Sequence, residues 1–166
     1  MAFSSEKGFS LAETVIALGV LTTGIIGAAS VLVAGMTNLS SSPADVITAQ
    51  KATQAVESVF AARDSKRLIW SQINNVSNGG VFLDGPQQLL VPGADGIVGT
   101  ADDGPSLEEI DIPNQTIKLT NYTRQIQIAD VANENGDLRK ITVTITYQNG
   151  GSKRSYVLVT YISAFA

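Results

Sequence analysis

The chain carries near its start the stretch Gly8-Phe9-Ser10-Leu11-Ala12-Glu13-Thr14, which opens an apolar run that continues to about Met36. Apart from Glu13, the residues from Leu11 to Ala34 are Leu, Ala, Val, Ile and Gly with a few Thr and Ser, whose hydroxyls can hydrogen-bond back to a helix. This segment meets the length of roughly 20 residues that a helix needs to cross a bilayer. The sequence therefore predicts a membrane-spanning helix that contains one charged residue.

Glu13 is the feature of this helix that requires an explanation. A charged side chain costs about 2.5–3.5 kcal/mol at the bilayer centre, less near the interface, and is usually retained because a partner pairs with it. If the chain were cut between Gly8 and Phe9, a new α-amino group would appear four residues before Glu13. That amine is cationic at neutral pH and can neutralise the carboxylate of its own or a neighbouring copy.

The run Lys7-Gly8-Phe9-Ser10-Leu11, with Glu13 as the fifth residue after the cut, resembles the type IV prepilin signal. The resemblance implies that a dedicated peptidase cuts after Gly8 on the cytoplasmic side and that Phe9 is then N-methylated. It also implies that the apolar helix is kept as a membrane anchor and later as a filament core, with Glu13 as the assembly carboxylate. Leu21–Ala29 is similar to the corresponding segment of the minor pseudopilins of type II secretion and of minor type IV pilins.

From this resemblance we expect a leader over residues 1–8, a transmembrane and filament-core helix over 9–42, and a soluble pilin-like domain over 43–166. The implied function is that of a minor pilin or pseudopilin in a type IV pilus or a type II secretion filament, without enzymatic activity. The implied partners are other pilin or pseudopilin subunits, prepilin peptidase and the inner-membrane assembly platform. The implied location is the cytoplasmic membrane, with the soluble domain outside the cytoplasm, and then the filament.

Other interpretations of the same residues remain open. A secretory signal peptide would have a shorter apolar core and would be removed, and a plain single-span anchor would leave Glu13 unexplained. The main alternative function is a membrane-tethered binding module with an exposed α+β domain. A membrane-anchored hydrolase would use two of the carboxylates of Asp102, Asp103, Glu108 and Glu109 as a pair.

Composition narrows the chemistry that is available to this chain. The 166 residues are 44% hydrophobic and 16% charged, with a formal charge of −4, which argues against a basic nucleic-acid-binding surface. Cysteine is absent, so disulfides and thiol chemistry are excluded. Histidine is absent too, which removes the commonest general base and the commonest transition-metal ligand. We expect no cofactor other than a possible calcium ion.

The sequence predicts a second, amphipathic helix after the apolar one. Ser40-Ser41-Ser42-Pro43 is expected to interrupt the first helix, because proline disfavours helical geometry in the residue before it. From Ala44 to about Ile73, apolar residues recur at helical spacing. They are Val46, Ile47, Ala49, Ala52, Thr53, Val56, Val59 and Phe60. We expect this apolar side to pack on a sheet.

A loop-rich region with an acidic, glycine-rich run follows from Asn74 to Pro113. Within it, 81–83 and 89–91 are candidates for short strands. Residues 93–104 hold Asp95, Asp102 and Asp103 between glycines, and such carboxylates are the ligands that calcium prefers. The spacing is not that of an EF-hand, and acidic turns of this kind are also common as plain solvated loops.

The C-terminal third has the period-two alternation of antiparallel strands. One strand is expected around Tyr122–Ile128, a second around Ile141–Tyr147 and a third over Tyr156–Ile162, with a hairpin turn at 148–152. A three-stranded meander packed against the second helix gives the predicted fold class, α+β, with a long N-terminal helix and a small antiparallel sheet.

Overall fold

The computed structural model describes residues 10–149 and 151–165, with the side chains of all of these except residues 37–42 and 149. The expected leader over residues 1–8, the cleavage residue Gly8 and the new terminus Phe9 lie outside the described residues. The chain divides into two compact units, Met1–Ser42 and Pro43–Ala166, and each is described by itself below.

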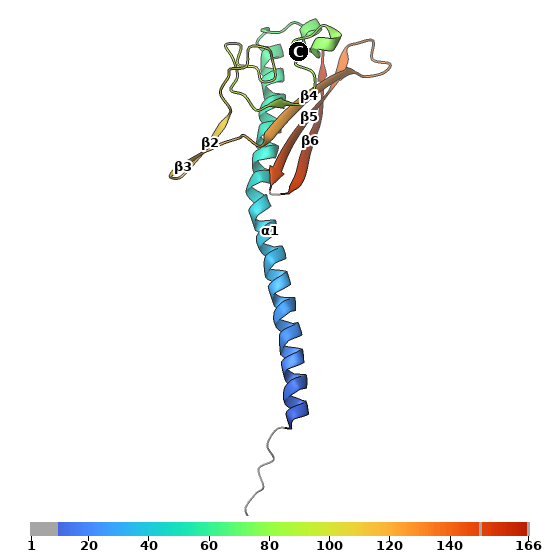
Figure 1. Ribbon diagram of the computed structural model, residues 1–166. Helices are drawn as coiled ribbons and strands as arrows, with labels where there is room; N and C mark the ends of the chain where they lie inside the picture. The colour runs from blue at the N-terminus through green and yellow to red at the C-terminus, as the bar shows by residue number, and fades with distance from the viewer. Residues whose placement is uncertain (1–9, 150, 166) are drawn as a thin grey trace, which may run out of the picture. The chain divides into compact units, whose positions relative to one another are not determined.

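One helix, α1, spans Leu11–Asp64 and includes Pro43 (Figure 1). The expected interruption at Ser40–Pro43 is therefore wrong. A proline inside a helix removes the hydrogen bond that its missing N–H would donate, and its ring crowds the carbonyl four residues earlier. The residues after Pro43 nevertheless stay helical, because the later turns of α1 are held by packing in the core with the sheet. This shows that proline alone did not decide where the helix ends.

α1 ends at Asp64, so the expected helix end near Ile73 is also wrong. Lys66 has a left-handed backbone with φ of 57°. Its N–H donates to the Arg63 carbonyl at 2.9 Å, and the Arg67 N–H donates to the Ala62 carbonyl at 2.9 Å. This pair of bonds is the Schellman arrangement, which closes a helix by satisfying its last carbonyls. Two short 3-10 helices follow, η1 over Trp70–Gln72 and η2 over Val76–Asn78.

The sheet contains the three predicted strands and a fourth one. Its strands are β1 over Gln87–Gln88, β4 over Tyr122–Asp130, β5 over Leu138–Asn149 and β6 over Ser152–Ser163. They pair antiparallel in the order β1-β4-β5-β6, which confirms the meander of the last three strands. The β5–β6 turn lies where the hairpin signal predicts it, since Asn149 pairs with Ser152.

The loop region differs from the sequence-based expectation. Residues 81–83 and 89–91 make only isolated bridges, Asn75 to Phe82 and Leu90 to Leu107, instead of the expected strands. A separate two-stranded hairpin is present that the sequence analysis did not predict, with β2 over Glu109–Ile112 and β3 over Gln115–Lys118. Its strands are short, and a polar residue separates the Ile residues, so the alternation is too brief to stand out.

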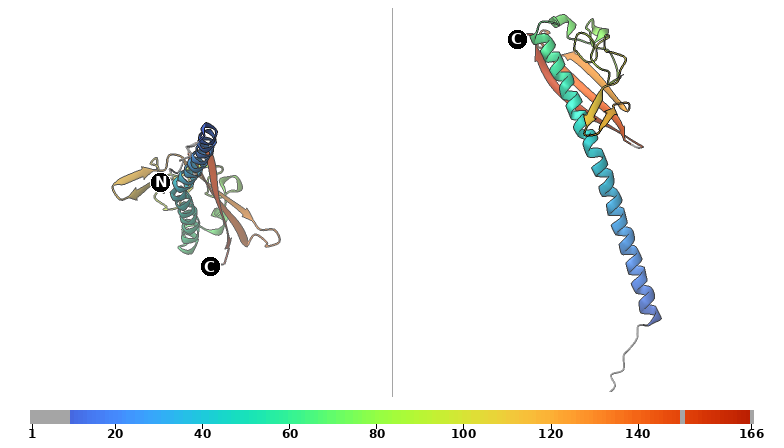
Figure 2. Two further views of the ribbon diagram at one scale, coloured as in Figure 1. Left: turned by 90° about the horizontal axis from the view of Figure 1, so that it is seen from below. Right: turned by 90° about the vertical axis from the view of Figure 1, so that its left-hand side faces the viewer.

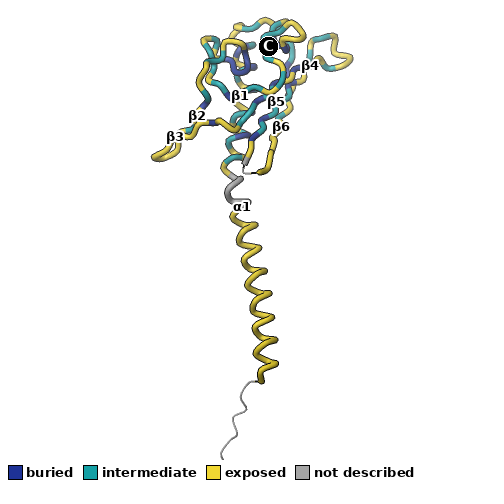
Figure 3. The backbone as a smooth tube through the Cα atoms, in the orientation of Figure 1, coloured by how far each residue is buried: buried dark blue, intermediate teal, exposed yellow. Residues whose placement is uncertain are grey.

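The core of the second unit lies between the C-terminal part of α1 and one face of the sheet (Figures 2 and 3). The helix contributes small residues at helical spacing, which allow the sheet to approach closely. They are Ala52, Ala55, Val59 and Ala62, all fully buried. The buried side of the helix is therefore rotated slightly about the helix axis from the predicted side. Val46, which was predicted to lie on the buried side, is 63% exposed. The fold is α+β, as predicted.

The sheet buries the side that its alternation predicts. Ile141, Val143, Ile145 and Tyr147 of β5 are at most 2% exposed, and Ile126 and Ile128 of β4 join them.

Candidate functional site

Leu11–Met36 of α1 is long and apolar enough to cross a membrane. Its side chains are exposed. The hydroxyls in this stretch donate to carbonyls about one turn earlier: Thr22 to Gly19 at 2.9 Å and Ser30 to Ile26 at 2.9 Å. These bonds satisfy hydroxyl groups that would be costly to leave without a partner in lipid. Glu13 is the only charged side chain of this segment.

Glu13 and Ser10 exchange two hydrogen bonds at the start of α1. The Ser10 N–H donates to Glu13 Oε2 at 2.9 Å, and the Glu13 N–H donates to Ser10 Oγ at 3.2 Å. This is a capping box, which satisfies two backbone donors that a helix start would otherwise leave free. The carboxylate also lies at the positive end of the helix dipole.

The amine that cleavage would create is therefore not the only partner available to Glu13. The capping partner could have been found from the sequence, because Ser10-Leu11-Ala12-Glu13 has the Ser-x-x-Glu pattern just before an apolar run. The structure therefore gives Glu13 a role in starting the helix that does not require cleavage.

Asp95 and Asp102 lie close together in the acidic loop, on either side of one hydroxyl. Thr100 Oγ1 is 2.7 Å from Asp102 Oδ1 and 3.2 Å from Asp95 Oδ2. Asp102 Oδ2 accepts the Asp95 N–H at 3.2 Å, and Asp95 Oδ1 accepts the Ile97 N–H at 2.7 Å. The hydrogen bond from Thr100 is the main cause of a lowered pKa at Asp102.

Asp103 is turned into the protein instead. Its Oδ2 accepts the Gly99 N–H at 2.7 Å and lies 3.8 Å from Arg124 Nη2. Burial raises the pKa of Asp103, against the lowering effects of the Gly99 N–H and the Arg124 charge. Neighbouring carboxylates thus have pKa values displaced in opposite directions, because one is hydrogen-bonded at the surface and the other is desolvated.

The three predicted calcium ligands do not form one site. The structure brings Asp95 and Asp102 together but directs Asp103 toward Arg124. Among residues 10–149 and 151–165, no group of three or more acidic side chains is placed to hold a metal ion. Calcium normally takes six to eight oxygen ligands, so the residues present do not fit the expected ion.

Two glycines fix the shape of this loop. A Cβ at Gly93 would lie 2.1 Å from the backbone oxygen of Asp102, a contact that no side chain can relieve. Gly99 has a left-handed backbone with φ of 84°, and a Cβ there would lie 2.8 Å from Ile126 Cδ1. The loop therefore needs glycine at both positions to place Asp102 and to rest on β4.

A buried ionic cluster links this loop to α1 and β4. Arg124 Nη1 lies 2.9 Å from Glu108 Oε1, and Lys51 Nζ of α1 lies 2.6 Å from Glu108 Oε2. Asp103 is the fourth member, through Arg124. Arg124 falls within the predicted strand Tyr122–Ile128, whose alternating pattern indicates no partner for it. The Glu108 carboxylate, 16 residues earlier in the chain, allows a charge on that buried face.

The four carboxylates considered for a hydrolase each have a partner inside the fold. Asp102 is hydrogen-bonded by Thr100, and Asp103 by the Gly99 N–H. Glu108 pairs with Arg124, and Glu109 is exposed and pairs with Lys118 at 3.3 Å. A glycosidase-type mechanism uses two carboxylates that flank one bond, whereas each of these four contacts a donor or a cation of the protein itself.

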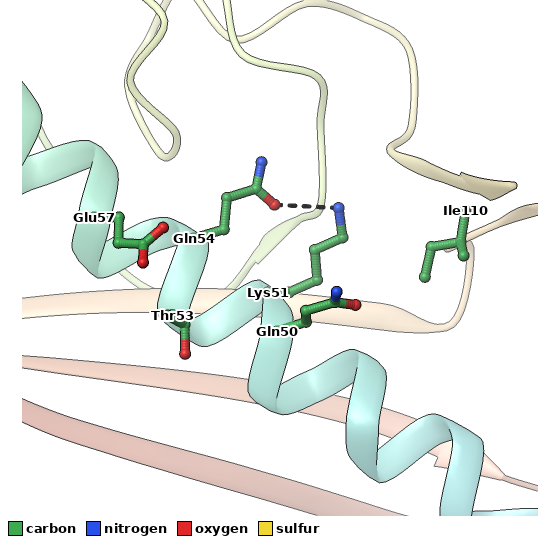
Figure 4. Close-up of a pocket in the computed structure, with 6 residues that line it drawn as sticks. All are labelled: Gln50, Lys51, Thr53, Gln54, Glu57 and Ile110. Carbon is green, nitrogen blue, oxygen red and sulfur yellow. Dashed lines mark hydrogen bonds between the residues drawn. The ribbon is translucent and has the colours of Figure 1, made fainter.

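A hollow of about 490 Å³ lies beside the cluster, over the exposed side of α1 (Figure 4). It is lined by Gln50, Lys51, Thr53, Gln54 and Glu57 of α1 and by Ile110 of β2. Lys51 Nζ donates to Gln54 Oε1 at 3.2 Å across its floor. The hollow is open, and all of its lining residues except Ile110 are polar, so it suits a hydrogen-bonding ligand or the side chains of another protein.

Comparison of the chain with known protein families, curated proteins and solved structures gave no match.

Proposed function

We propose that this chain is a membrane-anchored structural subunit of a pilin-like filament, a minor pilin or pseudopilin that is processed between Gly8 and Phe9. Leu11–Met36 would anchor the subunit in the cytoplasmic membrane before assembly, with the unit Pro43–Ala166 outside the cytoplasm. The subunit would meet prepilin peptidase, then an inner-membrane assembly platform, and finally other subunits of a type IV pilus or type II secretion filament.

The observation that carries this proposal is the placement of Glu13. It is the only charged residue of an apolar segment, and its carboxylate is held at the N-terminal end of α1 by the Ser10 N–H. Cleavage after Gly8 would create a cationic amine on Phe9, the residue directly before Ser10. A charge pair between that amine and a Glu13 carboxylate would offset the cost of keeping the acid in an apolar filament core.

The fold supports the proposal in a second way. α1 is 54 residues long and serves two environments, since its first part is apolar on all sides and its last part packs on a sheet. A plain anchor needs only about 20 residues. One helix that joins an anchor to a folded unit suits a subunit in which the same segment has to leave the membrane and become part of an assembly.

The direct test is the mass of the mature N-terminus. Full-length protein purified from membranes should begin at Phe9, with the added mass of a methyl group. Gly8→Leu should leave an uncut precursor, because a bulky residue would block the peptidase, whereas Ser4→Leu in the same leader should be processed normally. A mature terminus elsewhere than Phe9, or normal processing of Gly8→Leu, would contradict the proposal.

The hollow beside Ile110 favours a second candidate, a membrane-tethered binding module. In that case only the unit Pro43–Ala166 would carry the function, and Glu13 would serve the helix start alone. The terminal mass separates the two candidates, because a tethered module does not need a cut at Gly8-Phe9.

A further inference from the structure

After Lys153 and Arg154 at its start, the outer edge of β6 lacks the protection that edge strands usually have. β6 is last in the strand order and pairs with β5 along its whole length, and no strand in the described part of the chain pairs with its other side. Natural proteins shield such edges with charges, proline, bulges or a covering segment, because unpaired backbone groups capture other strands. Ser155–Ile162 reads Ser-Tyr-Val-Leu-Val-Thr-Tyr-Ile, without charge or proline.

β6 also presents an apolar stripe on the sheet face that does not pack on α1. Val157, Val159 and Tyr161 are 53%, 48% and 54% exposed. They alternate with Leu158 and Ile162, which are turned toward the core. Next to the stripe, β5 contributes Thr142 and Thr144, which pair with Val159 and Val157. A strand added to β6 would therefore meet an uncharged surface with high strand propensity.

The hairpin of β2 and β3 is the second incompletely partnered element. It forms its own two-stranded sheet, and all of its strand residues except Ile110 are exposed. Figure 1 shows it standing away from the four-stranded sheet. An isolated two-stranded hairpin is at best marginally stable in water. Ile112 and Ile117, 42% and 37% exposed, add an energetic reason for it to acquire a neighbour.

The two faces of the hairpin match the two faces of β6. Ile110 pairs with Ile117, so these two and Ile112 lie on one face. The other face is net acidic, because it holds Glu109 and Asp111 with one cation, Lys118, which pairs with Glu109. In edge pairing, the faces of an added hairpin continue the faces of the sheet. The Ile face would then adjoin the exposed apolar stripe of β6. The acidic face would fall on the side of Arg154, which is 47% exposed and pairs only loosely with Asp45, at 3.8 Å.

We propose that the β2–β3 hairpin of one copy adds to the β6 edge of a second copy of this chain. The contact joins two different surfaces of the same subunit, in a head-to-tail arrangement. It leaves a free hairpin at one end and a free β6 at the other, and it propagates from subunit to subunit. The inference rests on the proposed function for its setting, in which many copies are gathered in one membrane or filament.

Disulfide crosslinking of the full-length chain tests this contact, and the absence of native cysteine removes any background. Double variants would combine Ile112→Cys or Ile117→Cys with Val157→Cys or Val159→Cys, four pairs in all, to cover the possible registers. A disulfide forms only when the two Cβ atoms approach to about 3.5–4.5 Å. After oxidation in membranes or filaments, at least one pair should give a ladder of covalent dimers, trimers and higher species on non-reducing gels.

Each component variant alone should remain monomeric, because its own partner surface carries no cysteine. Glu134→Cys combined with Val159→Cys is the matched control, since Glu134 is exposed in the β4–β5 loop, outside both surfaces. The fluorescence of Trp70, the single tryptophan, would verify that each variant is folded. Covalent dimers from Val159→Cys alone would show β6 facing β6 and overturn the proposal. So would an equal ladder in the control, or no ladder from any of the four pairs.

The same samples separate this inference from the proposed function. A ladder from chains whose mass shows no cut before Phe9 would keep the contact and remove the pilin-like filament. Correct processing of folded variants that form no ladder would keep the filament and remove this contact.

Discussion

Arg124 and Glu108 form a charge pair at 2.9 Å inside the protein, with side chains only 1% and 5% exposed. The pair joins β4 to the segment that follows the acidic loop, and Lys51 extends it to α1 at 2.6 Å from Glu108. Burying such charges is costly unless each has a partner. The cluster therefore fixes how the loop lies on the helix and the sheet.

Removing the arginine should strongly destabilise the fold. Arg124→Met keeps much of the side-chain volume but leaves Glu108 with Lys51 alone and Asp103 without a cation, at a cost of about 3–5 kcal/mol. The measurement is denaturant unfolding of the full-length chain in detergent, followed by the fluorescence of Trp70. That side chain is a suitable reporter, because its Nε1 donates to the Gly136 carbonyl at 2.8 Å and Arg139 stacks on its ring.

Lys118→Met is the matched control for this prediction. It breaks the exposed Glu109–Lys118 pair, and exposed pairs contribute only about 0–1 kcal/mol. Equal effects of the two substitutions would show that the buried cluster contributes no more than a surface pair.

Asp102 and Asp103 should affect the pH dependence of stability in opposite directions. The pKa of Asp103 is raised by burial, so the stability that it contributes is present below its ordinary pKa and is lost as pH rises through the raised value. The pKa of Asp102 is lowered by hydrogen bonds, so its contribution is present above its ordinary pKa and is lost as pH falls through the lowered value.

As pH rises from acid to neutral, the unfolding free energy of Asp103→Asn should therefore increase relative to that of the wild type. The unfolding free energy of Asp102→Asn should decrease relative to that of the wild type. Both substitutions remove one negative charge, so the general effect of net charge is the same in each. Unfolding free energies at a series of pH values would provide the comparison. Slopes of the same sign for the two variants would refute the assignment of their environments.

Replacing glycine by alanine in the acidic loop should lower the stability of the protein at Gly93 but not at Gly104. Gly93→Ala places a Cβ 2.1 Å from the Asp102 backbone oxygen, so the loop has to move, at a cost of about 1–3 kcal/mol. Gly104→Ala in the same loop meets nothing closer than 3.5 Å, from the Val91 oxygen. The midpoints of denaturant unfolding should differ accordingly, and indistinguishable midpoints would contradict the loop geometry.

The parts of the fold that sequence predicted well are those with long, regular patterns. The alternation of Ile141, Val143, Ile145 and Tyr147 gave the correct buried face, and the pairing of Asn149 with Ser152 lies where the turn residues indicate it. The apolar run gave a helix that can span a membrane. In these segments many residues follow the same pattern, so a single irregular position does not change the predicted secondary structure.

Errors arose where one local signal was opposed by distant contacts. Pro43 predicted a helix break, but the continuing helix packs on a sheet that is formed far later in the chain. The three candidate calcium ligands are not brought together, because Asp103 is turned toward Arg124, a residue of β4. Composition showed that Asp95, Asp102 and Asp103 are close in sequence, but it could not show which way each carboxylate turns.

Glu13 can be tested by separating its charge from its hydrogen bond. Glu13→Gln keeps an oxygen that can accept from the Ser10 N–H, since glutamine also completes a capping box, but it removes the charge. Ser10→Ala does the converse, because it removes the Oγ that accepts the Glu13 N–H and leaves the carboxylate, at a cost of about 0.5–2 kcal/mol to the helix start.

If a neighbour's Phe9 amine pairs with Glu13, Glu13→Gln should enter the membrane normally yet enter filaments poorly. Glu13→Lys should be worse, because it places a cation beside that amine. Ser10→Ala should assemble nearly as well as the wild type. The measurement is the ratio of filament-incorporated to membrane-resident protein at matched total protein, with the N-terminal mass confirming that every variant is cut. If Glu13→Gln assembles normally while Ser10→Ala does not, Glu13 acts only as a helix cap, and the main reason for preferring a filament subunit over a simple anchor is lost.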